Sequence, residues 1–340
     1  MTNGGTRRRW RLLAALVVVV VVAAACEAVP NDYTGDRTSD LVYRDTNDNW
    51  YVAGQTAPLY TGNPYAIAVP GDYDGDLEWE PAELNGTTWT SSALATPIDY
   101  DPAGMPTGPA ATLATGQAAE PTLVPVPGDY DGNGKTVPAY YDQVDGTWWI
   151  MGHDQPIQFG NPPVTGGIDD YDVPVPADYD GDHKTDIAIF RPSDGSFHYL
   201  SSKTGQVVVV QAGSDLDFPV PQDYDKVGHA EPAVADANFE HWYLAGSTTP
   251  MASFDISWQD WAIPTFGDYN GDGHADPAVW DMGSTDTWLV AGEGAVATMP
   301  VDGYGGGDVE MPPWLLVNMV RLTLYHHCLG NPASTPPGTC

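Results

Sequence analysis

Short apolar runs alternate with clusters of turn residues along most of this chain. The same order of segments recurs about every 45 residues: Val-Pro or Ile-Pro, an acidic turn, an alternating apolar run, a second turn, an aromatic run and a last apolar run. The copy at 175–210 shows all of them, with its last apolar run at 207–210. Four short strands in a unit of this length predict one blade of a β-propeller.

One aromatic residue holds a near-constant place in each copy, 17 to 20 residues after the first aspartate of the acidic turn. These residues are Trp50, Trp89, Trp148, Phe197, Trp242 and Trp288. Because successive side chains of a strand point to opposite faces of its sheet, we expect these rings to pack between neighbouring blades. An exposed row of rings that stacks on sugars is the alternative.

The repeats predict an all-β fold, a β-propeller of about six four-stranded blades, with seven as the alternative. We assign the propeller to residues 26–303. One interval between copies is longer because of a Pro-, Ala-, Thr- and Gly-rich insertion near 102–120. This insertion is too short for another blade and is expected to form a surface loop.

The N-terminal end differs from the repeats. Arginines at 7–9 and 11 precede an apolar run at 12–25, which is short for a membrane span, and residues 1–25 are therefore assigned as a signal peptide. Cys26 follows three alanines, as in the lipobox of bacterial lipoproteins, whose cysteine is lipidated. We expect an exported cell-surface lipoprotein anchored to the membrane through Cys26. Plain secretion and an uncleaved anchor are the alternatives.

The C-terminal end, residues 304–340, is expected to be an extension of the propeller. Cys328 and Cys340 enclose a short loop rich in Gly and Pro, and an exported protein favours a disulfide between them. Residues 314–329 favour a helix docked on the propeller, with a pair of strands as the alternative.

The charge of the chain is strongly negative, with 46 acidic and 12 basic residues and a net charge of −34. Such a surface repels phosphate backbones, so nucleic acid is not expected as a partner. Solubility alone would explain many carboxylates, but their spacing indicates that they are grouped to hold cations.

The acidic turns follow the pattern D-x-D-G-D-x-x-x-D. Carboxylates at alternate positions of a tight loop point at a common centre, and glycine lets the backbone wrap around an ion. Positions one, three, five and nine would supply side-chain oxygens, and position seven would supply its carbonyl oxygen. Oxygen ligands of this kind suit calcium rather than zinc or copper.

The six loops differ in how many of these donors they hold. The fourth loop has Asp178, Asp180, Asp182, Lys184 and Asp186, and the sixth has Asp268, Asn270, Asp272, His274 and Asp276. The second has Asp72, Asp74, Asp76 and Glu80; the first has Asp32, Asp36 and Asp40; the third has Asp129, Asp131 and Asn133. The fourth and sixth loops are complete, and we expect them to fill before the fifth. The fifth loop is expected to be empty, because it has Val227 at position five and Lys226 in place of glycine.

These repeats resemble the FG-GAP/VCBS repeats of integrin α-subunit propellers and of many bacterial surface proteins. The resemblance implies calcium bound between the first two strands of a blade. It does not imply one biological role.

The function expected from these features is that of a non-enzymatic, calcium-binding surface module for a protein or glycan partner. The sequence has no G-x-S-x-G elbow, and no serine and histidine are grouped as in a hydrolase. A carbohydrate-active enzyme, such as a polysaccharide lyase on a propeller scaffold, is the alternative, although basic residues for its groove are few. A purely structural envelope protein is the third reading.

Overall fold

The computed structural model of the chain describes residues 28–45, 47, 49–63, 65–102, 123–162, 171–256, 262–281, 287–298 and 308–309. The proposed signal peptide, Cys26, the Cys328–Cys340 pair and the C-terminal helix lie outside these residues. No helix within the described ranges has the length and apolar character needed to cross a membrane.

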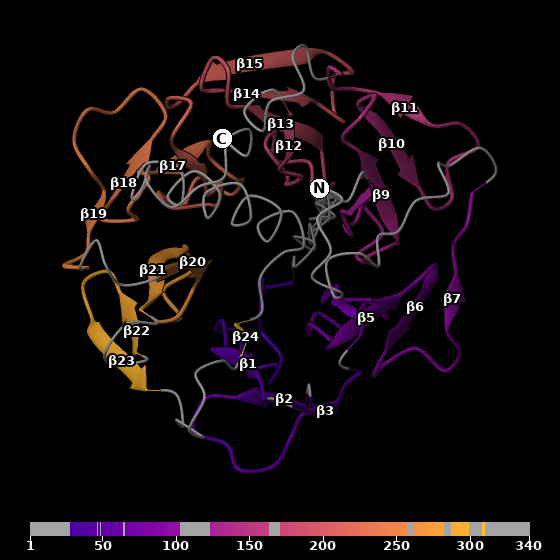
Figure 1. Cartoon of the computed structure of the whole chain (residues 1–340), viewed down its shortest axis with the longest axis horizontal. Coiled ribbons are helices and arrows are strands. Elements are labelled where there is room, and N and C mark those ends of the chain that lie inside the picture. The colour runs from indigo at the N-terminus through magenta and orange to yellow at the C-terminus, as the bar shows by residue number, and fades with distance from the viewer. Residues whose placement is uncertain are drawn as a thin grey trace, which may run out of the picture.

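Six four-stranded antiparallel sheets form the blades of a propeller, as the repeats predicted (Figure 1). The first blade has β24 (Asp308–Val309), β1 (Val42–Arg44), β2 (Asn49–Val52) and β3 (Tyr60–Thr61). The second has β4 (Ile67–Ala68), β5 (Ala82–Asn85), β6 (Thr88–Ser91) and β7 (Ile98–Asp99). The third has β8 (Leu123–Pro125), β9 (Ala139–Asp142), β10 (Thr147–Ile150) and β11 (Ile157–Gln158).

The remaining three blades repeat this order. The fourth has β12 (Val173–Pro174), β13 (Ile187–Arg191), β14 (Ser196–Leu200) and β15 (Val207–Gln211). The fifth has β16 (Phe218–Pro219), β17 (Ala233–Ala235), β18 (His241–Leu244) and β19 (Ala252–Ser253). The sixth has β20 (Ala262–Gly267), β21 (Asp276–Asp281), β22 (Thr287–Val290) and β23 (Gly294–Thr298).

The ring closes in the first blade, where the two ends of the propeller meet. β24 pairs antiparallel with β1, with Val309 opposite Tyr43 and Asp308 opposite Arg44. This strand lies within 304–340, the segment that the sequence assigned to the C-terminal extension. The propeller therefore takes its closing strand from beyond residue 303.

The repeated aromatic residues form the core between blades, as predicted. All six lie on the third strand of their blade and are at most 1% exposed. Two of them also bond to the next blade: Trp50 Nε1 donates to Glu83 Oε1 at 3.3 Å, and Trp89 Nε1 donates to the hydroxyl of Tyr140 at 3.0 Å. Burial on this scale explains why the aromatic position is the most regular feature of the sequence.

Candidate metal centres on one face of the propeller

The first aspartate of each acidic loop holds the loop's backbone in place. In the fourth loop, Asp178 Oδ1 accepts from the N–H of Gly181 at 2.7 Å, and its Oδ2 accepts from the N–H of His183 at 2.8 Å. Gly181 and His183 are positions four and six of this loop. The N–H at position six donates to the first aspartate in all six loops, and the N–H at position four does so in all but the fifth. Short polar side chains form such turns readily, which explains the regular first position.

The same two loop positions have left-handed backbone in every copy. Position four is glycine in five loops, with φ between +69° at Gly132 and +82° at Gly75, and Lys226 takes φ +57° in the fifth. Glycine adopts this region without the steric cost that other residues meet. The six loops therefore share one backbone conformation despite their different side chains.

The ninth position closes the loop from the other side. Glu80 Oε2 accepts from the N–H of Tyr73 at 2.8 Å, Asp186 Oδ2 from that of Tyr179 at 2.9 Å, and Asp276 Oδ2 from that of Tyr269 at 3.0 Å. Val137 occupies the ninth position of the third loop, and its side chain has no oxygen to accept a hydrogen bond or bind an ion.

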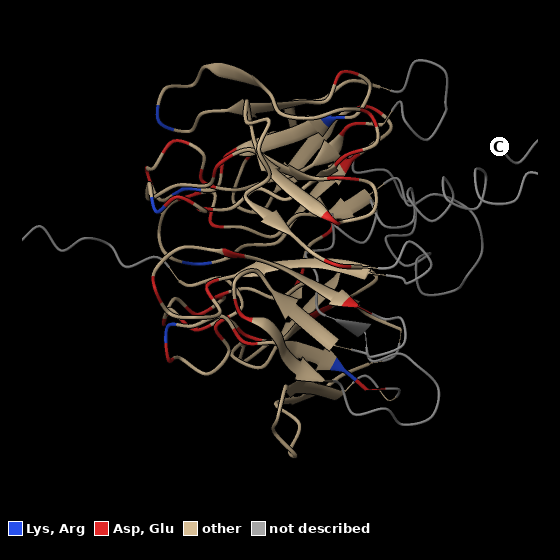
Figure 2. Cartoon of the chain, turned by 90° about the vertical axis from the view of Figure 1, so that its left-hand side faces the viewer, with Lys and Arg blue, Asp and Glu red and all other residues tan. Residues whose placement is uncertain are grey.

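Backbone hydrogen bonds join the six loops into a closed ring. The N–H at position eight of each loop donates to the carbonyl of the first aspartate in the preceding loop, at 2.6 to 2.8 Å. The pairs are Trp79–Asp32, Thr136–Asp72, Thr185–Asp129, Ala230–Asp178, Ala275–Asp223 and Ser39–Asp268. All six loops therefore lie on one face, at the left in Figure 2, where acidic residues gather together with Lys and Arg.

The second loop brings four carboxyl groups together. Asp72, Asp74, Asp76 and Glu80 each place an oxygen within 4.8 Å of the others. Burial raises the pKa of Glu80 to about 8 against the lowering effect of the Tyr73 N–H, and the charges of Asp74, Asp72 and Asp76 raise it further. Asp72 and Glu80 are buried while Asp74 and Asp76 are exposed, so an ion could enter from solvent.

The fourth loop brings three carboxylates together, those of Asp178, Asp180 and Asp182. Asp180 Oδ1 is buried and has no hydrogen-bond partner. Asp186 stands apart, because its two oxygens accept from the N–H groups of Tyr179 and Ser202. Burial raises the pKa of Asp186 to about 6.

The other four loops do not gather three carboxylates this closely, although all of their residues are described. In the sixth loop, Asp272 Oδ2 lies 3.0 Å from Nε2 of His274. In the third, Asp131 Oδ1 lies 3.5 Å from Nε2 of His153. In these two loops, side chains that the sequence assigned to an ion face an imidazole instead.

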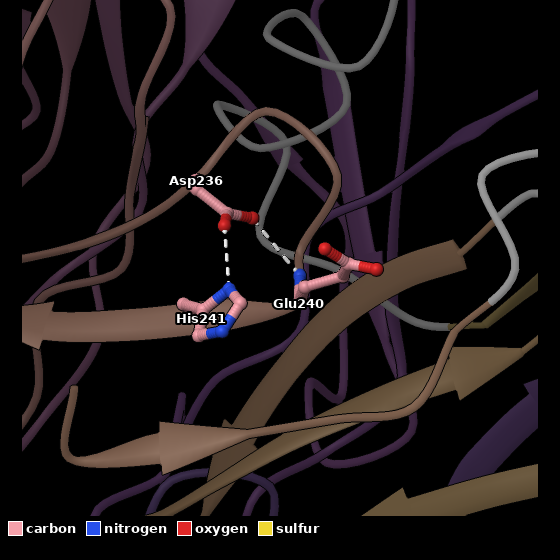
Figure 3. A group of neighbouring side chains, drawn as sticks. All are labelled: Asp236, Glu240 and His241. Atoms are coloured by element: carbon pink, nitrogen blue, oxygen red, sulfur yellow. Dashed lines mark hydrogen bonds and ion pairs between the residues drawn. The ribbon is translucent and has the colours of Figure 1, made fainter.

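A further group, which the sequence reasoning missed, lies at the hairpin between β17 and β18. Asp236, Glu240 and His241 each offer a ligand atom within 4.8 Å of the others (Figure 3). Asp236 Oδ1 accepts from the N–H of Glu240 at 2.9 Å, and Oδ2 lies 3.0 Å from Nδ1 of His241. Asp45 binds the N–H of Asn49 in the same way in the first blade. The repeated role of this aspartate is to cap a turn.

A serine–histidine pair, also missed, occurs on β14. Ser196 Oγ lies 2.8 Å from Nε2 of His198, but Ser196 is 2% exposed and its hydroxyl donates to Asp194. Nη1 of Arg191 lies 3.3 Å from the same imidazole nitrogen. Burial and the nearby Arg191 lower the pKa of His198. A serine that is buried and bound to a carboxylate is not poised as a nucleophile.

Comparisons with known proteins give structural likeness alone. No family model matches the chain, and no curated protein matches it. A solved lectin of Agrocybe aegerita, described for recognition of non-reducing terminal N-acetylglucosamine, is 15% identical over 80% of this chain and 78% of its own, with a TM-score of 0.40. Two structures of BBS1N in complex with ARL6DN are 14% identical over 84% of this chain and 87% or 89% of theirs, with TM-scores of 0.37. Likeness at these values carries no argument about function.

Proposed function

We propose that this protein is a calcium-binding β-propeller of the FG-GAP/VCBS type. In this proposal it is exported, is held at the cell surface by a lipid on Cys26, and presents a face of the propeller to a protein or glycan partner. The second loop is the observation that carries the calcium proposal.

The fit to calcium is best in the second and fourth loops. Four carboxyl groups that converge without a cation repel one another, and this repulsion adds to the effect of burial in raising the pKa of Glu80. Calcium takes six to eight oxygen ligands in flexible geometry, which such loops could complete with the carbonyl at position seven and with water. The ion would neutralise the charges and stiffen the loop.

The third and fifth loops fit calcium poorly. Val137 and Val227 stand where a ligand is needed. Extracellular calcium modules bind with Kd on the order of 10⁻⁴ to 10⁻³ M, so the loss of one ligand would leave such a loop empty at ordinary calcium concentrations.

A binding module, rather than an enzyme, is the reading that the described residues favour. The six loops form one continuous face through their ring of backbone bonds, which is a rigid platform for a partner. The serine and histidine on β14 are not arranged for catalysis. A glycan array probed with and without calcium would identify a partner of the carbohydrate class.

Calcium should stabilise the fold, because it binds the folded loops and not the unfolded chain. Melting in millimolar calcium should occur several degrees higher than in EDTA. Asp74→Asn, at position three of the second loop, should lower the calcium stoichiometry by one. Asp225→Asn, the same change in the fifth loop, should leave it unchanged. Equal melting temperatures in calcium and EDTA would refute the proposal.

A further inference from the structure

Lys226 is the exception in the repeating loop backbone. It stands at the fourth position of the fifth loop, where the other five loops have glycine, and it adopts the same left-handed conformation. A lysine takes this conformation at an energetic cost that glycine does not pay.

The ammonium group of Lys226 lies at the sixth loop and not over its own. Its Nζ donates to the main-chain carbonyl of Asp272. The same Nζ lies 2.9 Å from the point where a Cβ on Gly273 would be, so the sixth loop has room for it only because Gly273 has no side chain.

The direction of this contact is the reverse of that in the other blades. There, the residue at position seven of one loop reaches back over the position-four glycine of the preceding loop, as Lys135 does over Gly75 and Lys184 over Gly132. In the fifth blade, position four itself carries the side chain, and it reaches forward to the next loop. Lys226 belongs to the fifth loop by sequence, but its charge lies against the sixth.

The sixth loop needs positive charge. Asp268, Asp272 and Asp276 are its three acidic residues, all within nine positions of the chain. Asp272 already turns its carboxylate to His274, and Lys226 holds the carbonyl of the same residue. His274 thus competes with an ion for the carboxylate at position five, and Lys226 places a positive charge beside the same residue.

We propose that Lys226 is a tethered cation that supplies the sixth loop with charge that calcium supplies elsewhere, so that this loop binds calcium more weakly than the second and fourth. This inference rests on the calcium-binding function proposed above. It also separates the sixth loop from the fourth, which the sequence treats as equally complete.

The test compares Lys226→Met with Lys226→Arg in the full chain. Both keep a side chain at the left-handed position, so they differ in charge while the backbone strain is matched. Calcium stoichiometry is measured by equilibrium dialysis at calcium near 10⁻³ M, and melting is measured in EDTA and in calcium. Lys226→Met should bind one calcium more than the wild type, and Lys226→Arg should bind the same number. Adding Asp272→Asn to Lys226→Met should remove the gained ion.

In EDTA, Lys226→Met should melt a few degrees below Lys226→Arg, and the difference should shrink as salt screens the exposed positive charge of the arginine. An unchanged calcium stoichiometry in Lys226→Met, while Asp74→Asn loses one ion, would overturn this inference and leave the calcium function standing. If no variant binds calcium, the proposed function fails. The EDTA comparison then decides the role of Lys226, because equal melting of the Met and Arg variants would exclude a tethered cation.

Discussion

At the scale of single residues, Glu80 links calcium binding to the protonation of a buried carboxyl group. Its carboxyl group is buried beside Asp72 and accepts from the N–H of Tyr73, and its pKa is raised from 4.5 to about 8. The metal-free protein therefore keeps a proton on this group near neutral pH, and calcium must displace that proton in order to bind.

The stability of the metal-free protein should consequently depend on pH. Between pH 4.5 and about 8 the folded chain holds a proton on Glu80 that the unfolded chain has lost. The stability that this bound proton gives the folded chain is fully present below pH 4.5 and is lost as the pH rises through about 8. We expect the melting temperature in EDTA to fall between pH 6.5 and pH 8, and Glu80→Gln to flatten this part of the curve. A profile for Glu80→Gln as steep as that of the wild type would contradict the assignment.

At the scale of elements, β15 is one of two long outer strands. Like β23, it is five residues long, whereas β3, β7, β11 and β19 have two residues each. Val207 and Val209 are 56% and 57% exposed. The bonds from Ala212 to Gly195 and from Ser201 to Gln206 turn the even-numbered residues of this strand toward β14. The backbone groups of Val207 and Val209 therefore face outward, as an edge open to another strand.

Placing a charge on this edge should reduce self-association at high protein concentration. Val209→Lys introduces the kind of residue that protects edge strands from pairing. Val144→Lys, at another exposed valine, in the hairpin between β9 and β10, is the control. Light scattering on concentrated samples should fall for the first variant and not for the second, with melting temperatures unchanged. Equal scattering from the wild type and both variants would show that β15 is already protected.

The sequence predicted those elements whose residues are fixed by burial or by backbone conformation. The aromatic third strands must fill the space between blades, and the first aspartate of each loop must bind its own backbone, so both recur at regular positions. The direction of Lys226 depends on a contact between two loops, and the turning of Asp272 toward His274 depends on a side-chain contact within the sixth loop. Residue spacing carries no information about such contacts.

At the scale of the whole molecule, closure depends on a very short strand. β24 has two residues and no apolar run, which explains why the sequence did not reveal it. It nevertheless supplies the fourth strand of the first blade and joins the two ends of the propeller.

Breaking this pairing should weaken the entire ring. Replacing both Asp308 and Val309 by proline removes any N–H that β24 donates to β1. We expect a clear drop in melting temperature and faster proteolysis of the first blade. The measurement is melting together with limited proteolysis and mass spectrometry of the fragments. Unchanged melting and cleavage would show that the first blade is stable with three strands.

The ring of backbone bonds between the loops has neither a first nor a last member. Each loop donates to the loop before it and accepts from the loop after it, and the final bond joins Ser39 to Asp268 across the chain ends. A gene that lost or duplicated one repeat would have to find new partners for the two loops at the junction. A circular permutant with its ends between any two blades would keep every bond. The architecture thus resists change in copy number while tolerating change in where the chain begins.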